Sequence, residues 1–282
     1  QNVLLRLTPG IDPHTYEAVS TGKVNSKFGA AVETGQAMEL VKLALTLPHL
    51  DLRGLHCHVG SQVFGEDVYQ RTLDIMVPFL AQIRDETGVT LSDLNLGGGY
   101  GVRYTAEDEA INIPARLAEL AAHLKEETER LGLPMPRFLM EPGRSIVADA
   151  GMTLYTVGSV KRIPGYKQYA AVDGGMTDNP RYALYKAPYT VVPASRMNDA
   201  REVTCTVAGR CCESGDLIQE NIQLPEMQRD DLLAVLTTGA YNFTMASNYN
   251  RLCRPALVMV RNGKARLAVR RQTFADLVAC DL

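Results

Sequence analysis

The sequence predicts two joined regions, an α/β region of parallel βα units and a mostly antiparallel β region. From residue 2 to about 148, short apolar runs alternate with longer amphipathic stretches, as in parallel βα units. From about residue 151, short β-rich segments dominate, and Asn262-Gly263 separates two of them as in a type I′ hairpin. We therefore expect half of an α/β barrel at residues 1–150 and a β domain at residues 151–282.

The first region contains repeated strand-then-helix steps. The expected strands are apolar runs that end in glycine or polar residues: 3–7, 52–59, 91–99 and 137–143. The expected helices carry apolar residues at helical spacing: 34–47, 66–86 and 114–130, the last opening with Pro114. In such folds the residues that follow the strands share one edge of the sheet, and active sites usually lie at that edge.

The second region contains short strands, a hairpin and a terminal helix. The expected strands alternate apolar and polar residues: 152–163, 168–175, 201–209 and 231–239. The hairpin is expected at 256–270 and the helix at 273–282. Neither an internal repeat nor a low-complexity segment interrupts this order.

The composition excludes several classes of protein. The 282 residues are 46% hydrophobic and 22% charged, with a formal net charge of -3, which argues against a nucleic-acid partner. No run of about 20 apolar residues is present, so we expect no membrane partner. The six cysteines show no CxxC spacing and do not resemble a disulfide framework, so a reducing cytoplasm is the expected location.

Polar or glycine-rich motifs follow three successive strands. In HCHVGSQ, His56 and His58 could bind a metal or simply pack, and Ser61 offers a hydroxyl that suits a phosphate. In NLGGGYG the glycine spacing differs from a dinucleotide-binding fingerprint. The glycines could cradle an anion or only form a tight turn.

EPGRS places the carboxylate of Glu141 and the guanidinium of Arg144 around a Pro-Gly bend. A surface turn could have the same sequence. Three such motifs at one sheet edge are much less probable by chance than any one of them alone, so this edge is the predicted site.

The β region adds weaker candidates. Arg181 and Tyr185 are four residues apart, so a helical turn would present both side chains to one place. Tyr241 follows a turn of small residues. In GRCCESGD, Cys211 and Cys212 could be metal ligands, a disulfide, packing residues, or one reactive thiol beside a bystander.

Taken in order, HCHVGSQ, NLGGGYG, EPGRS, DGGMTDNPRYALY, CCESGD and GAYNFTMASNYN resemble the fold-type III pyridoxal-phosphate-dependent decarboxylases. The resemblance covers essentially the whole chain. It implies the C-terminal half of a (β/α)8 barrel, with about strands 5 to 8, followed by the β domain. It also implies pyridoxal 5'-phosphate as cofactor and a homodimer with shared active sites.

The resemblance assigns a role to each candidate. His58 would stack on the pyridine ring, and Glu141 would face its nitrogen. The phosphate would be held by Ser61, by the amides of Gly98 and Gly99, and by the backbone of Gly143 and Arg144. Tyr241 would contact both cofactor and substrate.

Within the family, the resemblance implies decarboxylation of the amino acid meso-2,6-diaminopimelate to L-lysine and CO2. Arg144, Arg181 and Tyr185 would grip the distal carboxylate. Glu213 would pair with the distal ammonium, and Cys212 would return a proton to the reacting carbon across the dimer. Cys211 has no matching role.

Other substrates and roles remain open. Relatives acting on carboxynorspermidine, ornithine or arginine are alternatives, although ornithine and arginine enzymes carry Asp after the cysteine. A non-catalytic regulatory homologue is a further alternative. Tyr182 departs from the family, which usually has Pro after the arginine.

The Schiff-base lysine of the family lies in a Tyr-Ala-x-Lys-Ala-Asn-like motif near the first barrel strand, and this sequence contains no such motif. We therefore expect an earlier part of the protein to precede Gln1. We also expect no decarboxylation by this polypeptide alone, and an aggregation-prone open sheet edge.

Overall fold

The structure is a computed structural model that describes residues 1–12, 22 and 24–282. The chain forms two compact units. Unit 1 comprises Gln1–Val102 and Glu109–Ser145, and unit 2 comprises Arg103–Asp108 and Ile146–Leu282. The predicted domain limits at residues 150 and 151 remain a prediction.

Unit 1 is built on a parallel sheet in the order β2-β1-β3-β4-β5. Its strands are β1 (Asn2–Thr8), β2 (Ala30–Ala31), β3 (Asp51–His56), β4 (Asp93–Asn95) and β5 (Arg137–Leu139). The sheet does not close on itself among the described residues. The expected partial α/β barrel is confirmed.

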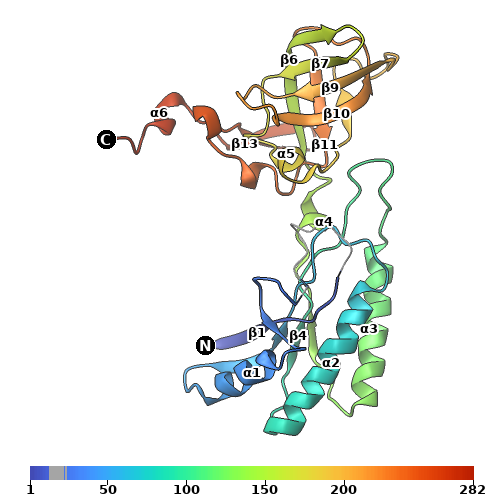
Figure 1. Cartoon of the computed structure of the whole chain (residues 1–282), viewed down its shortest axis with the longest axis vertical. Helices are drawn as coiled ribbons and strands as arrows, with labels where there is room; N and C mark the ends of the chain where they lie inside the picture. Colours follow the sequence, from blue (N-terminus) through green and yellow to red (C-terminus); the bar gives the residue numbers. More distant parts are fainter. Residues whose placement is uncertain (13–21, 23) are drawn as a thin grey trace. The chain divides into compact units, whose positions relative to one another are not determined.

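Three helices connect these strands: α1 (Gln36–Thr46), α2 (Val68–Thr87) and α3 (Ile113–Arg130). Figure 1 shows α2 and α3 running side by side along the sheet. Asn112 caps α3 by accepting the Ala115 N–H at 3.2 Å, and Pro114 stands in the first turn, where its missing N–H costs nothing.

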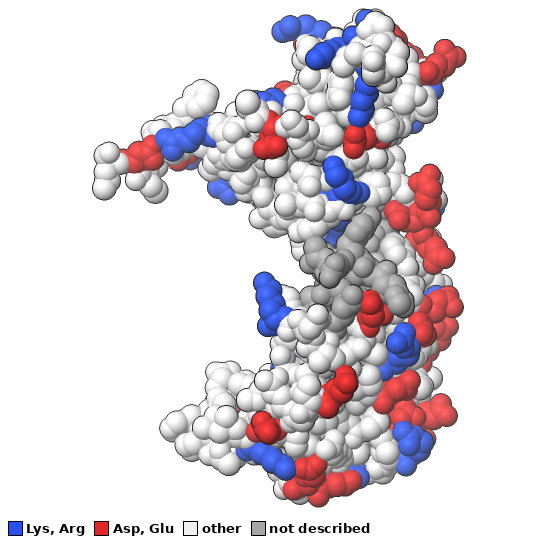
Figure 2. Space-filling model, viewed as in Figure 1, with Lys and Arg blue, Asp and Glu red and all other residues white. Residues whose placement is uncertain are grey.

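The core of unit 1 fills the space between the sheet and the helices. Leu55 of β3 pairs in register with Leu94 of β4, and both side chains are fully buried. They belong to one apolar cluster with Leu73 of α2 and Leu124 of α3. Figure 2 shows acidic side chains gathered along the side where α2 and α3 lie, as expected for the solvated face of these helices.

Unit 2 is built on a sheet in the order β10-β9-β7-β6-β11-β8. Its strands are β6 (Met152–Ile163), β7 (Lys167–Val172), β8 (Val191–Pro193), β9 (Val203–Ala208), β10 (Leu217–Leu224) and β11 (Leu232–Leu236). Only the β7–β9 pair is parallel among these neighbours. The mostly antiparallel β domain is therefore confirmed, with β8 and β10 added to the expected strands.

A separate hairpin joins β12 (Leu257–Arg261) to β13 (Lys264–Val269), followed by α6 (Phe274–Leu277). Asn262 and Gly263 have φ values of 51° and 70°, as a type I′ turn requires. Thr273 caps α6 in a capping box with Asp276. Short helices elsewhere are α4 (Arg144–Val147), α5 (Arg181–Tyr185), η2 (Phe243–Met245) and η3 (Tyr249–Arg251).

The packing of β3 on β4 makes Gly54 sensitive to substitution. A Cβ on Gly54 would lie 2.0 Å from the carbonyl oxygen of Asp93, its register partner. We expect Gly54→Ala to lower the free energy of unfolding by about 1–3 kcal/mol, because the strands must separate to admit the methyl group. Urea unfolding of the full-length gene product measures this change.

Gly158→Ala is the matched control, since it is also a strand glycine and its nearest neighbour would be 3.8 Å from the new Cβ. We expect it to leave stability unchanged or slightly raised. Equal losses in the two variants would contradict the steric explanation.

Candidate active site

Three strand ends meet at the carboxyl edge of the unit 1 sheet. β3 ends at His56 and β4 at Asn95, and these residues are register partners. β5 ends at Leu139, the register partner of Asn95, and Glu141 follows two residues later. Parallel pairing therefore brings side chains from three distant stretches of sequence to one place.

The carboxylate of Glu141 is oriented by its neighbours. Asn95 Nδ2 donates to Glu141 Oε1 at 2.9 Å, and His56 Nε2 lies 3.4 Å from Glu141 Oε2. Asn95 Oδ1 accepts the Gly97 N–H at 2.8 Å, so the amide group can present only its donor to Glu141. The Glu141 side chain nevertheless remains 55% exposed, so this anion is fixed in direction and open to a ligand.

The two histidines of HCHVGSQ have lowered pKa values. Burial is the largest cause for both; the charge of Arg6 adds to it, and Glu141 opposes it. Both imidazoles are therefore neutral at neutral pH, and the His56–Glu141 contact is polar rather than a full ion pair. His58 Nδ1 accepts the Gly98 N–H at 3.3 Å, which puts the His58 proton on Nε2.

The glycine loop approaches its neighbours too closely for side chains. A Cβ on Gly98 would lie 2.1 Å from the carbonyl oxygen of Glu141. Gly99 has φ 118°, and a Cβ there would lie 2.2 Å from the carbonyl oxygen of Gly60. The loop thus presents bare backbone at the same edge as Glu141, as an anion cradle requires.

Arg144 and Ser61 complete this edge. The buried Arg144 guanidinium donates from Nη2 to Ser61 Oγ at 2.9 Å. A Cβ on the neighbouring Gly143 would meet nothing within 4 Å, so space is open there. A cation, a hydroxyl and bare backbone together form a donor set that fits a phosphate.

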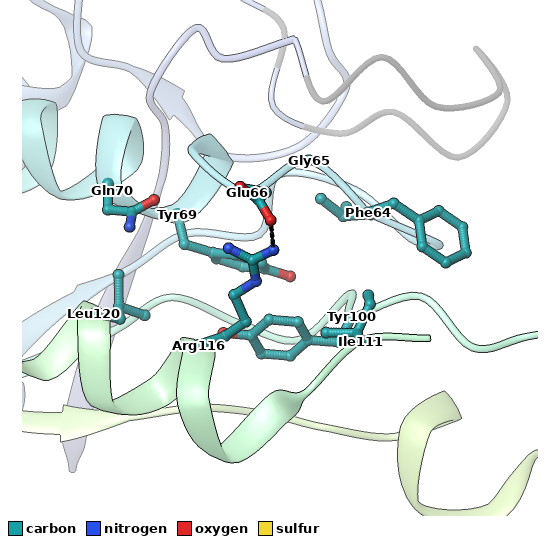
Figure 3. Close-up of a pocket in the computed structure, with 10 residues that line it drawn as sticks. Phe64, Gly65, Glu66, Tyr69, Gln70, Tyr100, Ile111, Arg116 and Leu120 are labelled. Carbon is teal, nitrogen blue, oxygen red and sulfur yellow. Dashed lines mark hydrogen bonds and ion pairs between the residues drawn. The ribbon is translucent and has the colours of Figure 1, made fainter. Parts of the chain in front are cut away.

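A small cavity lies beside the glycine loop (Figure 3). The rings of Tyr69 and Tyr100, tilted by 36° with centroids 4.6 Å apart, form part of its wall, and Arg116 pairs with Glu66 across it. Tyr69 donates its hydroxyl to the Gly98 carbonyl at 3.1 Å. The cavity has room for about one water molecule, so it supports the loop but cannot hold a cofactor.

In unit 2, Asp216 holds together the loops 173–178 and 209–216. Its buried carboxylate accepts the Met176 N–H at 2.6 Å and the Cys211 N–H at 2.7 Å. A Cβ on Gly175 or Gly209 would lie 2.5 Å or less from this carboxylate. The shape of the GRCCESGD loop therefore depends on one buried anion.

The adjacent cysteines have different environments. Burial, together with the charge of Asp216, raises the pKa of Cys211 to about 11, so its thiol stays protonated and unreactive. Cys212 is exposed, and its N–H donates to Asn250 Oδ1 at 2.9 Å. Glu213 is also exposed, and its Oε2 accepts the Tyr249 hydroxyl at 3.3 Å. The available thiol of the pair is Cys212.

Arg181 is a buried cation at the start of α5. Its side chain is held by a hydrogen bond from Nη1 to the Tyr189 hydroxyl at 2.6 Å, and its guanidinium lies 4.7 Å from the Tyr104 ring centroid. The residue is only 6% exposed. Among the described residues, no Asp or Glu lies within ion-pair distance of it.

The remaining candidates of unit 2 lie on its short helices and turns. The expected helical turn from Arg181 to Tyr185 is present as α5, and Tyr185 is half-buried. Tyr241 is exposed and has φ 61°, a left-handed backbone conformation that is rare for tyrosine.

The structure gathers the predicted residues of unit 1 at one edge of its sheet. His58, Ser61, Gly98, Gly99, Glu141, Gly143 and Arg144 all lie at or next to the carboxyl edge of unit 1. Cys212, Glu213, Arg181, Tyr185 and Tyr241 belong to unit 2. Their roles at a bound cofactor or substrate remain predictions.

Sequence reasoning did not assign roles to several supporting residues: His56, Asn95, Asp216, Tyr249 and Asn250. The signal for His56 and Asn95 was a polar residue at the very end of an apolar strand. Nothing local marked Asn250, because its partner Cys212 is 38 positions away in the chain.

Residues 1–148 match the sequence model of a protein family, the pyridoxal-binding domain of the pyridoxal-dependent decarboxylases. These residues contain the glycine loop and Glu141. The chain belongs to this decarboxylase family. The resemblance of the sequence to the pyridoxal-phosphate-dependent decarboxylases is thereby confirmed.

Individual relatives agree with this family. A diaminopimelate decarboxylase of Bacillus subtilis is 46% identical over 281 residues, which is 100% of this chain and 64% of that protein. The crystal structure of diaminopimelate decarboxylase from M. jannaschii in complex with L-lysine matches with a TM-score of 0.87 and 32% identity. That match covers 100% of this chain and 63% of the other.

A more distant relative is the lysine/ornithine decarboxylase of Vibrio vulnificus complexed with putrescine. It matches with a TM-score of 0.70 and 25% identity, covering 88% of this chain and 61% of the other. The chain thus spans less than two thirds of the length of these relatives.

Two kinds of feature are absent from the part of the chain that the structure describes. No helix there is long and apolar enough to cross a membrane. Nor do three or more His, Cys, Asp or Glu side chains converge there as metal ligands would.

The hydrogen bond from Asn95 to Glu141 yields a testable prediction. Asn95→Ala removes the donor that orients the carboxylate, and a hydrogen bond to a charged group contributes about 1.5–3 kcal/mol. We expect the full-length gene product to bind pyridoxal phosphate about 10- to 100-fold more weakly. Titration of the apoprotein, followed by visible absorption, gives the dissociation constant.

Asn112→Ala is the control, because it also removes an asparagine hydrogen bond but at the cap of α3. It should lower stability by about 1 kcal/mol and leave cofactor affinity unchanged. Wild-type affinity in Asn95→Ala would show that Glu141 needs no help from Asn95.

Proposed function

We propose that the full-length protein decarboxylates meso-2,6-diaminopimelate to L-lysine and CO2 with pyridoxal 5'-phosphate. The observation that carries the proposal is the buried Arg181, which has no acidic partner among the described residues. A buried guanidinium without an anion is costly, and a substrate carboxylate would supply one. The 46% identity to the Bacillus subtilis diaminopimelate decarboxylase supports the same substrate.

The edge of unit 1 fits the cofactor. Glu141 would face the pyridine nitrogen and keep it protonated, since a nearby carboxylate favours the charged form. His58 would stack on the ring as a neutral imidazole. When bound, the protonated pyridine ring withdraws the electron pair that the departing CO2 leaves behind.

The phosphate of the cofactor would lie against the glycine loop. Ser61 would donate its hydroxyl to the phosphate, beside the backbone of Gly143 and Arg144. The Arg144 guanidinium donates to Ser61 Oγ and would be left for the substrate. The Gly98 amide points at His58 Nδ1 at a long 3.3 Å, and we propose that it turns to the phosphate when the cofactor binds.

The protein would recognise the substrate by its distal carboxylate and distal ammonium groups. Arg181 and Arg144, with the Tyr185 hydroxyl, would hold the distal carboxylate. A guanidinium group can bind both oxygens of a carboxylate at once. Glu213 would pair with the distal ammonium. An amine precursor such as ornithine has no distal carboxylate, so it would leave Arg181 without an anion.

Cys212 would act as the general acid. Its Sγ would hold the proton that goes to the carbon from which CO2 has left, and solvent would then reprotonate the thiolate. A thiol suits this role because neighbouring charge can adjust its pKa. Tyr241 would contact cofactor and substrate beside it.

The active enzyme would be a homodimer. By family resemblance, Cys212 reaches the site of the other subunit, so each site would draw on both chains. We place the enzyme in the cytoplasm, where its six cysteines would stay reduced.

The test is a direct assay of the full-length gene product with bound cofactor. We expect release of CO2 from meso-diaminopimelate and little or none from ornithine or carboxynorspermidine. Turnover of either of those compounds alone would move the protein to another branch of the family. Cofactor binding without any turnover would favour a regulatory homologue.

Two substitutions probe the roles. Cys212→Ala should keep cofactor binding and lower kcat about 100- to 10,000-fold, because it removes the general acid. Arg181→Met should lower kcat/KM for meso-diaminopimelate at least about 30-fold, because a buried charge partner is lost. Cys211→Ala is the matched control and should stay within about twofold in kcat, since the half-buried Cys211 thiol stays protonated.

A further inference from the structure

The η3 turn directly contacts two of the exposed residues of the CCES sequence, Cys212 and Glu213. Asn250 Oδ1 accepts the Cys212 N–H at 2.9 Å, and the Tyr249 hydroxyl donates to Glu213 Oε2 at 3.3 Å. Two consecutive residues of one turn thus hold two consecutive residues of another. This pairing joins parts of the chain that lie 36 to 38 positions apart.

The η3 turn is itself held in place from several sides. Asn250 has φ 53° and ψ 23°, a left-handed conformation that asparagine tolerates better than most residues. The Ser247 N–H donates to the Thr177 carbonyl at 2.8 Å, in the loop that Asp216 also anchors. Asn248 Nδ2 donates to the Leu252 carbonyl at 2.8 Å and to Gln272 Oε1 at 2.6 Å. The turn is therefore a fixed platform for Cys212 and Glu213.

We propose that Asn250 and Tyr249 are positioning residues, Asn250 for the Cys212 thiol and Tyr249 for the Glu213 carboxylate. This inference rests on the proposed function, because it assigns these two residues to the same reaction. It makes Asn250 important for the rate of proton return and Tyr249 important for recognition of the distal ammonium.

Asn250 acts on the thiol through the backbone. The Cys211 N–H is held by Asp216 of the same loop and the Cys212 N–H by Asn250 of the η3 turn, so two successive peptide N–H groups have separate partners. The direction of the Cys212 Cα–Cβ bond follows from these anchors. Proton transfer depends steeply on such geometry, because the donor must lie within hydrogen-bond reach of the carbon.

Tyr249 acts on the carboxylate directly. The charge of Glu213 raises the pKa of the Tyr249 hydroxyl, which therefore remains a proton donor at neutral pH. The hydroxyl occupies Oε2 of Glu213 and leaves Oε1 for an ammonium group. A free glutamate side chain would sample more rotamers and would lose entropy on binding the substrate.

Asn250 is tested by a pair of variants in the full-length holoenzyme. Asn250→Gly keeps the left-handed backbone but removes the acceptor, so we expect kcat for meso-diaminopimelate to fall about 10- to 100-fold. Asn250→Asp keeps an oxygen acceptor and should retain most of kcat. KM and the visible absorption of the bound cofactor should stay near wild type in both. Equal kcat in Asn250→Gly and wild type would overturn this half of the proposal.

Tyr249 is tested by Tyr249→Phe. Loss of the hydroxyl should raise KM for meso-diaminopimelate about three- to tenfold and leave kcat within about twofold, because the ring is retained and one hydrogen bond to a charged group is lost. Tyr166→Phe is the control: Tyr166 is 89% exposed in the turn between β6 and β7. An unchanged KM in Tyr249→Phe, or a loss confined to kcat, would overturn the proposed role.

The outcomes separate this inference from the proposed function. If wild-type holoenzyme does not turn over meso-diaminopimelate, the proposed function fails before the variants are compared. If the wild type is active and the variants match it, only the positioning roles fail. Unchanged thermal unfolding of each variant, measured in parallel, excludes a general loss of folding.

Discussion

The hydrogen bond from Asn95 to Glu141 is the interaction on which the unit 1 site depends. It joins the ends of β4 and β5 at 2.9 Å and directs an otherwise exposed carboxylate. The same asparagine binds the Gly97 N–H and so connects the carboxylate to the glycine loop. Asn95 therefore fixes both the direction of the Glu141 carboxylate and the path of the glycine loop. A parallel sheet allows this arrangement, because its strands end at a common edge.

In unit 2, a buried carboxylate likewise fixes the path of a loop that carries candidate residues. Asp216 anchors the loop that carries Cys212, and it does so through backbone N–H groups of two loops. A buried carboxylate that accepts several N–H bonds is satisfied without a cation. Arg181 is the opposite case, a buried cation without an acidic partner among the described residues, held by the Tyr189 hydroxyl instead.

The order of elements could be predicted from local patterns, since helices such as α3 and strands such as β6 carry clear periodicity. β10 was missed because its sequence LIQENIQL is interrupted by polar residues, and its place in the sheet comes from pairing with β9. The candidate site residues were chosen through ordered motifs. The residues that support them could not be predicted in this way. The hydrogen bond from Asn95 to Glu141 spans 46 positions, and local periodicity carries no information about such distant pairs.

The protonation state of the cofactor nitrogen tests directly whether Glu141 faces the pyridine ring. The full-length gene product would be loaded with pyridoxal phosphate carrying 15N in the ring, and its chemical shift recorded by NMR for wild type and Glu141→Gln. A carboxylate facing that nitrogen predicts a protonated ring in the wild type and an unprotonated ring in the variant. The same shift in both proteins would contradict the placement of Glu141 at the pyridine nitrogen.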